Sequence, residues 1–158
     1  MFEPVDRSIS LLAAFFSLVG CATQIIGGIL QLAPLVVLGG SRSLSAFNAD
    51  QLQAAALLFL KLHSQTFNIS LVMFAVFELA IGYLIIRSTF LPRILGVLMV
   101  VAGCGWLTFV WPPLATSLFS YILALNVGEL LLPLWLLVKG VDVSRWQERA
   151  SARQIGLA

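Results

Sequence analysis

Long stretches of apolar residues without a charged side chain dominate the chain. Residues 8–41 and 94–128 contain no Asp, Glu, Lys or Arg. Runs of about 18 or more apolar residues are typical of helices that cross a bilayer. A backbone in lipid must satisfy its own hydrogen bonds, and these runs lack the alternating pattern of barrel strands. The pattern therefore predicts an all-α integral membrane protein.

Four spans are predicted, each close to the length that about 30 Å of hydrocarbon requires. We expect them to form one four-helix bundle from residues 10–32, 67–86, 94–110 and 120–138. Residues 87–89 end the second span, and Pro92 with Arg93 begins the third, because a proline at the start of a helix loses no hydrogen bond. The chain is interpreted as a single transmembrane domain, residues 1–158, whose residues 141–158 form a basic tail.

The segment between the first two spans contains a helix break and a helix start. Two glycines and a serine at 39–41 interrupt the first helix, and Asn48 with Gln51 matches a capping box. From Ala49 no Pro or Gly occurs until Gly82, which allows about 50 Å of helix, more than one crossing needs. We expect the additional turns to form an amphipathic segment on the outer face, with apolar residues at Leu52, Ala56, Phe59, Leu62 and Phe67.

Charged residues are few and unevenly placed. They make up 10% of the chain, against roughly 25% in soluble domains, and the mean hydropathy is +1.02. One side of the predicted topology carries seven basic residues: Arg7, Arg87, Arg93, Lys139, Arg145, Arg149 and Arg153. The other side carries only Arg42 and Lys61. The positive-inside rule therefore places both termini in the cytoplasm.

The tail and the tryptophans suggest contacts at the membrane surface. Arg145, Arg149 and Arg153 follow one another at four-residue steps and would form one basic stripe beside Trp146. This stripe either contacts anionic lipid headgroups or is a solvated tail that sets the topology. Tryptophan is typical of the headgroup region, where we expect the residues near span ends, namely Trp106, Trp111 and Trp135.

Small and polar residues recur along the first span. Polar side chains lie at seven-residue intervals, at Ser10, Ser17, Gln24 and Gln31, and small ones follow three residues later at Ala13, Gly20 and Gly27. Such a seam allows helices to approach closely and to hydrogen-bond, so we interpret it, with Gly96 and Gly103 of the third span, as helix packing. Gln24 is also a candidate ligand, since the seam could instead line an internal cavity. Cys21 and Cys104 lie inside spans and indicate neither a disulfide nor a metal site.

Two acids lie deep in the predicted bilayer. Glu78 and Glu129 are both about 12 to 14 Å from the same side, and a carboxylate facing lipid would be costly. If they meet, they would share a proton and form a candidate relay or cation site; otherwise each is a protonated acid bonded to a neighbouring group. Asn126 lies one turn before Glu129, and Pro133 cannot donate to the carbonyl of residue 129. Glu129, Glu78 and Asn126 are therefore candidate ligand or proton-binding residues.

His63 is the only histidine and is the last candidate. On a straight helix it lies within about 80° of Ser70 and Glu78, so these residues could line a path to the acids. The alternative is a solvated interfacial histidine. One imidazole cannot supply two haem ligands or a zinc site, and neither a catalytic motif nor a basic nucleic-acid domain is found. No cofactor, metal or nucleic-acid partner is implied.

Several motifs resemble a bacterial family of multi-spanning membrane proteins known as a domain of unknown function. The most specific is the turn at 90–98 (FLPRILGVL), preceded by 82–84 (GYL) and 87–88 (RS); Glu129 and 135–141 (WLLVKGV) are also similar. The resemblance implies a polytopic helical bundle in a bacterial inner membrane, and it implies no activity.

The chain departs from that pattern in two places. Family members usually have additional spans before the segment that Pro4, Val5 and Arg7 match, so we expect those spans to be absent here. Where the family tends to place charged residues in the next span, this chain has Ser17 and Gly20. Glu78 is not expected from the resemblance.

Two functional hypotheses follow. The first is a non-enzymatic bundle, in contact with the lipid bilayer, that associates with itself or joins a larger membrane complex through its small and polar seams. The second is a proton-coupled or small-solute transporter with Glu78, Glu129 and Asn126 at its centre and His63 at the outer entrance.

Overall fold

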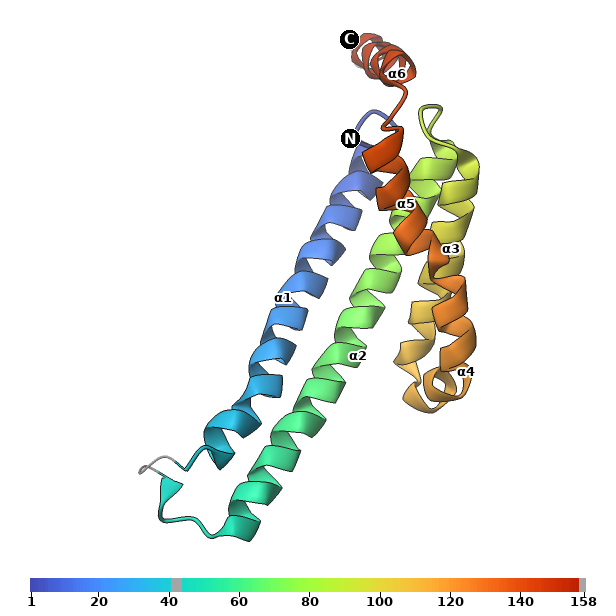
Figure 1. The fold of residues 1–158 in the computed structure, drawn as a ribbon. Coiled ribbons are helices and arrows are strands. Elements are labelled where there is room, and N and C mark those ends of the chain that lie inside the picture. Colours follow the sequence, from blue (N-terminus) through green and yellow to red (C-terminus); the bar gives the residue numbers. More distant parts are fainter. Residues whose placement is uncertain (41–43, 157–158) are drawn as a thin grey trace.

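The computed structural model describes residues 1–40 and 44–156, and these residues form helices and connecting turns without strands (Figure 1). The helices are α1 (Arg7–Leu38), α2 (Ala49–Arg87), α3 (Arg93–Leu107), the short 3₁₀ turn η2 (Thr108–Val110), α4 (Pro112–Leu125), α5 (Val127–Val138) and α6 (Val143–Ile155). Four stretches are long and apolar enough to cross a membrane: α1, α2, α3 with η2, and α4 with α5. The all-α membrane fold class is confirmed. Ser41 and Arg42 lie outside the described residues.

The first two helices form a long hairpin. Asn48 caps α2 as predicted: its side chain accepts from the Gln51 backbone N–H at 2.9 Å, and its own backbone N–H donates to the Gln51 side chain at 3.0 Å. From this cap α2 continues without interruption for 39 residues, or about 58 Å. Figure 1 shows α1 beside α2, with their far ends extending beyond the turn between α3 and α4. The additional turns of α2 therefore continue along its axis.

Helix α3 returns along α2 at very short distance. The turn between them is built as the sequence predicts, since α2 ends at Arg87 and α3 begins after Pro92. A Cβ placed on Gly96 would lie 2.7 Å from the carbonyl oxygen of Gly82, and one on Gly82 would lie 2.8 Å from that of Gly96. The two backbones touch here because neither residue has a side chain.

The fourth predicted span is divided into two helices. Helix α4 ends at Leu125, Asn126 adopts φ −76° and ψ 9°, and α5 begins at Val127. Consequently Glu129 lies in the first turn of α5 rather than in the middle of a long helix. Pro133, which the sequence identifies as a source of distortion, lies inside α5. This break determines where the candidate site forms.

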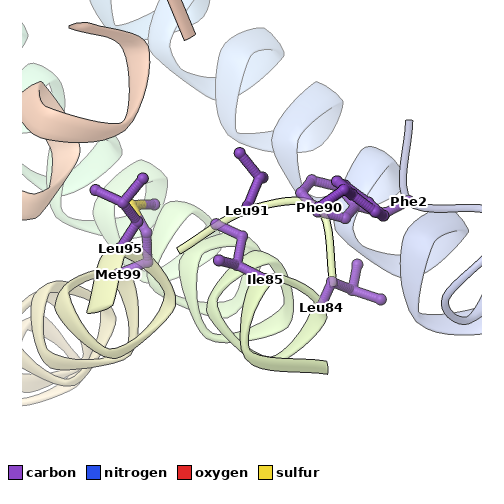
Figure 2. Close-up of a cluster of buried hydrophobic side chains, with 7 residues drawn as sticks. All are labelled: Phe2, Leu84, Ile85, Phe90, Leu91, Leu95 and Met99. Atoms are coloured by element: carbon purple, nitrogen blue, oxygen red, sulfur yellow. The ribbon is translucent and has the colours of Figure 1, made fainter. Parts of the chain in front are cut away.

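A cluster of apolar side chains closes the end of the bundle that holds both termini. Figure 2 shows Phe2 beside Phe90, with ring centroids 5.8 Å apart, and the cluster continues through Leu84, Ile85, Leu91, Leu95 and Met99. The N-terminal segment is therefore folded back onto the turn between α2 and α3.

Helix α6 lies across this same end of the molecule (Figure 1). Gly140 permits the change of direction after α5 because its φ of +67° is unfavourable for other residues. The basic stripe faces the bundle: Arg145 donates to the Thr89 carbonyl at 3.3 Å, Arg149 to the Arg87 carbonyl at 3.5 Å, and Arg153 to the Glu3 carbonyl. The tail is therefore a docked helix, and its arginines are not simply solvated.

Candidate functional site

A cavity of about 400 Å³ lies between α2, α3 and α5. Most of its wall is apolar and aromatic, and its polar members are two acids and an indole; the lining residues are Leu71, Phe74, Phe77, Glu78, Met99, Trp106, Glu129, Leu132 and Pro133. Glu78 is nine residues before the end of α2, or about 14 Å along the helix. The cavity is therefore within the segments that could cross the membrane.

The two acids line the same cavity. Glu78 comes from α2 and Glu129 from α5, and both side chains form part of its wall. Glu78 is only 4% exposed, and Gly103 of α3 provides the room for it, because a Cβ on Gly103 would lie 3.2 Å from the Cβ of Glu78. Two carboxyl groups that share a cavity in a low-dielectric medium cannot readily both carry a charge, so a shared proton or a bound cation is needed.

Trp106 is the third polar group of the cavity. Its indole N–H donates a hydrogen bond to the Glu129 carboxyl. Glu129 also occupies the first turn of α5, where the helix dipole favours negative charge. Trp106 therefore bonds to a partly buried acid, and its position at the headgroup level stays a prediction. The sequence contained only a weak signal for this role, since tryptophan near a span end is more typical of the interface.

Several polar atoms around the acids have no partner among the described residues. One carboxyl oxygen of Glu78 and both amide atoms of Asn126 are buried without a hydrogen bond. Asn126 is 7% exposed and forms the break one turn before Glu129. Buried polar atoms are normally paired, so three unpaired atoms near one pair of acids call for an explanation. A bound water, proton or polar ligand would satisfy them.

The other candidate ligands lie at the contact between α1 and α2. The His63 ring Nδ1 is 2.9 Å from the Gly27 carbonyl oxygen, and the Ser70 hydroxyl donates to the Gln24 side-chain oxygen at 2.5 Å and to the Phe67 carbonyl at 2.7 Å. Neither His63 nor Gln24 lines the cavity. The stripe predicted from His63 through Ser70 to Glu78 is therefore divided between two helix interfaces.

The predicted packing residues lie at helix contacts. Gly20 faces the ring of Phe74, 2.9 Å from an added Cβ, and Gly27 faces Thr66 at 3.5 Å. Ser17 is half-buried on the same helix. Gly96 and Gly103 face α2, and the sequence did not identify Gly82, the partner of Gly96, as a packing residue. Gly128 also approaches α3 closely, since an added Cβ there would meet the backbone of Leu98 at 2.9 Å.

The site is suited to cations and protons rather than to a coordinated metal. Among the residues that the structure describes, no three His, Cys, Asp or Glu side chains gather as a metal site would need. The cavity is much larger than a single ion, and Phe74, Phe77 and Trp106 contribute aromatic rings to its wall. Aromatic rings together with carboxylates are the groups that bind organic ammonium ions.

These features define a small helical membrane protein with four membrane-length helices and a cavity lined by two acids. The chain belongs to a family described as a domain of unknown function, DUF4386, whose model matches residues 1–140. The matched range includes the turn around Pro92 and both acids, and it ends before α6. Comparison with curated proteins and with solved structures gives no match.

Proposed function

We propose that the protein is a proton-coupled carrier that binds a small organic cation between Glu78 and Glu129 in exchange for a proton. The observation that carries this proposal is the presence of two carboxyl groups in the wall of one apolar cavity. Acids inside a membrane are costly, and they mark ion or proton pathways in many membrane proteins. The unpaired atoms of Glu78 and Asn126 add support, because a purely structural acid pair would leave fewer buried groups unsatisfied.

The two acids have different roles in this proposal. Glu129 carries the negative charge, because the Trp106 indole and the first turn of α5 both stabilise an anion there. Glu78 lies in the more apolar position and holds the exchangeable proton, with one oxygen free to bond to a ligand. An arriving ammonium group takes the place of that proton, and its apolar part contacts Phe74 and Phe77.

Vesicles reconstituted with the protein test this proposal. With 2-phenylethylammonium as the probe, a gradient of the amine should drive proton movement, followed with a pH-sensitive dye inside the vesicles. Glu129→Gln and Glu78→Gln should each reduce this flux at least ten-fold, since one interaction worth about 1.4 kcal/mol corresponds to a factor of ten. Wild-type flux in both variants would contradict the proposal.

Glu148→Gln is the matched control because it makes the same chemical change on exposed α6, away from the cavity. Its flux should equal that of the wild type. Infrared spectroscopy of the three variants measures the carboxylic acid band directly, and this measurement does not require the amine probe. The band of a buried protonated acid should be lost in Glu78→Gln and retained in Glu148→Gln.

We further propose that the shared end of the termini and α6 is cytoplasmic and that the protein lies in a bacterial inner membrane. Support comes from the basic residues at this end, where α1 begins at Arg7, α2 ends at Arg87 and α3 begins at Arg93. Cysteine-labelling from outside intact cells tests this orientation. A cysteine at Ala46, in the turn between α1 and α2, should react, and one at Ser144 should not.

Self-association is a second candidate function, favoured by the outer face of α1. Exposed residues with spacings of four and three form a continuous seam on it: Leu11, Phe15, Leu18, Ala22, Ile25, Ile29, Leu32 and Val36. This spacing is that of a left-handed helix pair. Native mass spectrometry should show a dimer that Leu18→Ala with Ile25→Ala weakens, while Leu57→Ala with Leu58→Ala on α2 leaves it unchanged. A monomer at all concentrations would exclude this candidate.

A further inference from the structure

A second pocket, distinct from the acidic cavity, lies where α6 crosses the end of the bundle. Its volume is about 570 Å³, and its wall comes from the N-terminal segment, the first turn of α1 and α6: Met1, Glu3, Pro4, Arg7, Ser8, Trp146, Ala150 and Arg153. These parts are far apart in the sequence and are joined by two hydrogen bonds. The Trp146 indole donates to the Met1 carbonyl at 2.9 Å, and Arg153 donates to the Glu3 carbonyl.

The pocket carries positive charge that the protein neutralises only in part. Arg7 and Arg153 contribute two guanidinium groups, and Glu3 is the one acid in the wall. Glu3 and Arg7 form an ion pair at 3.6 Å, but the two side chains are 67% and 68% exposed. Exposed pairs of this kind are weak, so an anion can compete for Arg7. Arg153 bonds to a backbone carbonyl, and no acid among residues 1–40 and 44–156 forms an ion pair with it.

The pocket is placed at the boundary between polar and apolar surface. Ser8 in its wall is followed on the same face of α1 by Leu11, Leu12 and Phe15, whose side chains are exposed. The Trp146 ring forms another part of the wall, and tryptophan is typical of the headgroup level. A molecule bound here would have a polar end in the pocket and an apolar part along α1.

We propose that this pocket binds the phosphate headgroup of an anionic phospholipid, with its acyl chains along Leu11, Leu12 and Phe15. The guanidinium groups of Arg7 and Arg153 hold the phosphate, because their planar donors match its oxygen atoms. Basic groups beside a span attract anionic lipids more strongly than zwitterionic ones. Helix α6 is outside the residues matched by the family, so the site is proposed for this chain alone.

The same helix offers a matched control. Arg145 is two turns before Arg153 on α6, and it does not line this pocket. Its charge is already paired with Asp142 at 3.2 Å. Arg145→Gln therefore removes one positive charge from the same surface without altering the proposed site.

Native mass spectrometry of the delipidated full chain, titrated with phosphatidylglycerol or with phosphatidylcholine of the same acyl chains, tests the proposal. We expect tighter binding of phosphatidylglycerol and a loss of about five-fold for Arg7→Gln and for Arg153→Gln. Arg145→Gln should bind as the wild type does. Glu3→Gln should bind phosphatidylglycerol more tightly, because it removes the acid that competes for Arg7. Circular dichroism of each variant verifies that it is folded.

Three results would overturn the proposal. Equal affinity for the two lipids would show that charge is not recognised. An equal loss in Arg145→Gln and Arg153→Gln would indicate attraction by net charge rather than a site. Displacement of the lipid by millimolar inorganic phosphate, with no effect of acyl chains, would indicate a free-anion site instead.

Discussion

Helix α2 presents polar residues on two sides, and the two sides differ in how these residues are satisfied. Toward α1, the Ser70 hydroxyl has two acceptors and His63 has one partner. Toward α3, one oxygen of Glu78 is buried without a partner among the described residues, and so are both amide atoms of Asn126, which lies between α4 and α5. Eight residues along one helix separate these two environments.

The difference separates structural polar groups from functional ones. Inside a membrane, hydrogen bonds between helices contribute modestly to association and are a common form of packing. Unpaired buried groups destabilise a fold, so their presence beside two acids indicates that the protein retains them for another purpose. The comparison supports the proposal that Gln24, Ser70 and His63 serve helix packing and that Glu78, Glu129 and Asn126 belong to the proposed site.

The largest effect should come from the glycines on the two sides of α2. Gly96→Ala places a Cβ 2.7 Å from the Gly82 carbonyl oxygen, and a backbone atom cannot move aside easily, so we expect a loss of about 1–3 kcal/mol in unfolding free energy. Gly27→Ala meets Thr66 at an ordinary 3.5 Å and should change little. Unfolding in mixed micelles measures both. Gly28→Ala, with open space around it, is the control, and an equal loss there would contradict the packing explanation.

The next effect should be a gain in stability. Asn126→Leu removes two buried polar atoms that have no partner, and we expect about 1–2 kcal/mol greater unfolding free energy, together with weaker binding of the amine probe. The same micelle titration and a binding assay give the two readings. Lower stability would show that Asn126 holds α4 and α5 together, and it would remove this residue from the proposed site.

Ser70→Ala tests the side of α2 on which the polar groups have hydrogen-bond partners. This variant should lower the unfolding free energy, whereas Asn126→Leu should raise it. The variant loses the hydrogen bond to Gln24, and bonds of this kind average about 0.6 kcal/mol in membrane proteins. We expect a loss of stability of about this size, with unchanged binding of the amine probe. Altered binding of the probe would show that the residues between α1 and α2 influence the cavity, and it would contradict the separation of the two sides of α2.

The smallest effect concerns Asp142, a solvent-exposed acid outside the membrane-length helices. Its bonds from the Ser144 hydroxyl and the Arg145 backbone N–H lower its pKa from the ordinary value. Its contribution to the start of α6 is therefore present above pH about 4 and is lost as the pH falls through the lowered pKa. The NMR signal of the Trp146 indole should stay constant from pH 7 to 5 and shift below pH 4. Asp142→Asn should remove the transition, and an unchanged transition would assign it to another group.

Much of the fold could be predicted because its signals are local. The apolar runs predict the helices, Asn48 with Gln51 predicts the start of α2, and Pro92 predicts the start of α3. The break at Asn126 had no local signal, because no Pro or Gly stands at that position. Two residues later, Gly128 packs closely against the backbone of Leu98, and such a tertiary contact is not visible in the local sequence.

The site could be predicted only in part, for a geometric reason. The depth of Glu78 and Glu129 follows from counting residues, but which faces of two helices meet depends on rotation about each axis. In a span that is apolar on all sides, the sequence contains little information about that rotation. Trp106 was missed for this reason, and the predicted stripe did not anticipate that His63 faces α1 while Glu78 lines a cavity with α3 and α5.

The hairpin of α1 and α2 also has a consequence for the order in which the chain assembles during synthesis. Its contacts are between neighbouring helices, so it can form once residue 87 has left the ribosome, and His63 and Ser70 then have their partners. Glu78 shares its cavity with Glu129 only after about 50 further residues, when α5 has been made. The acid pair is therefore completed last, by the helix that supplies Glu129.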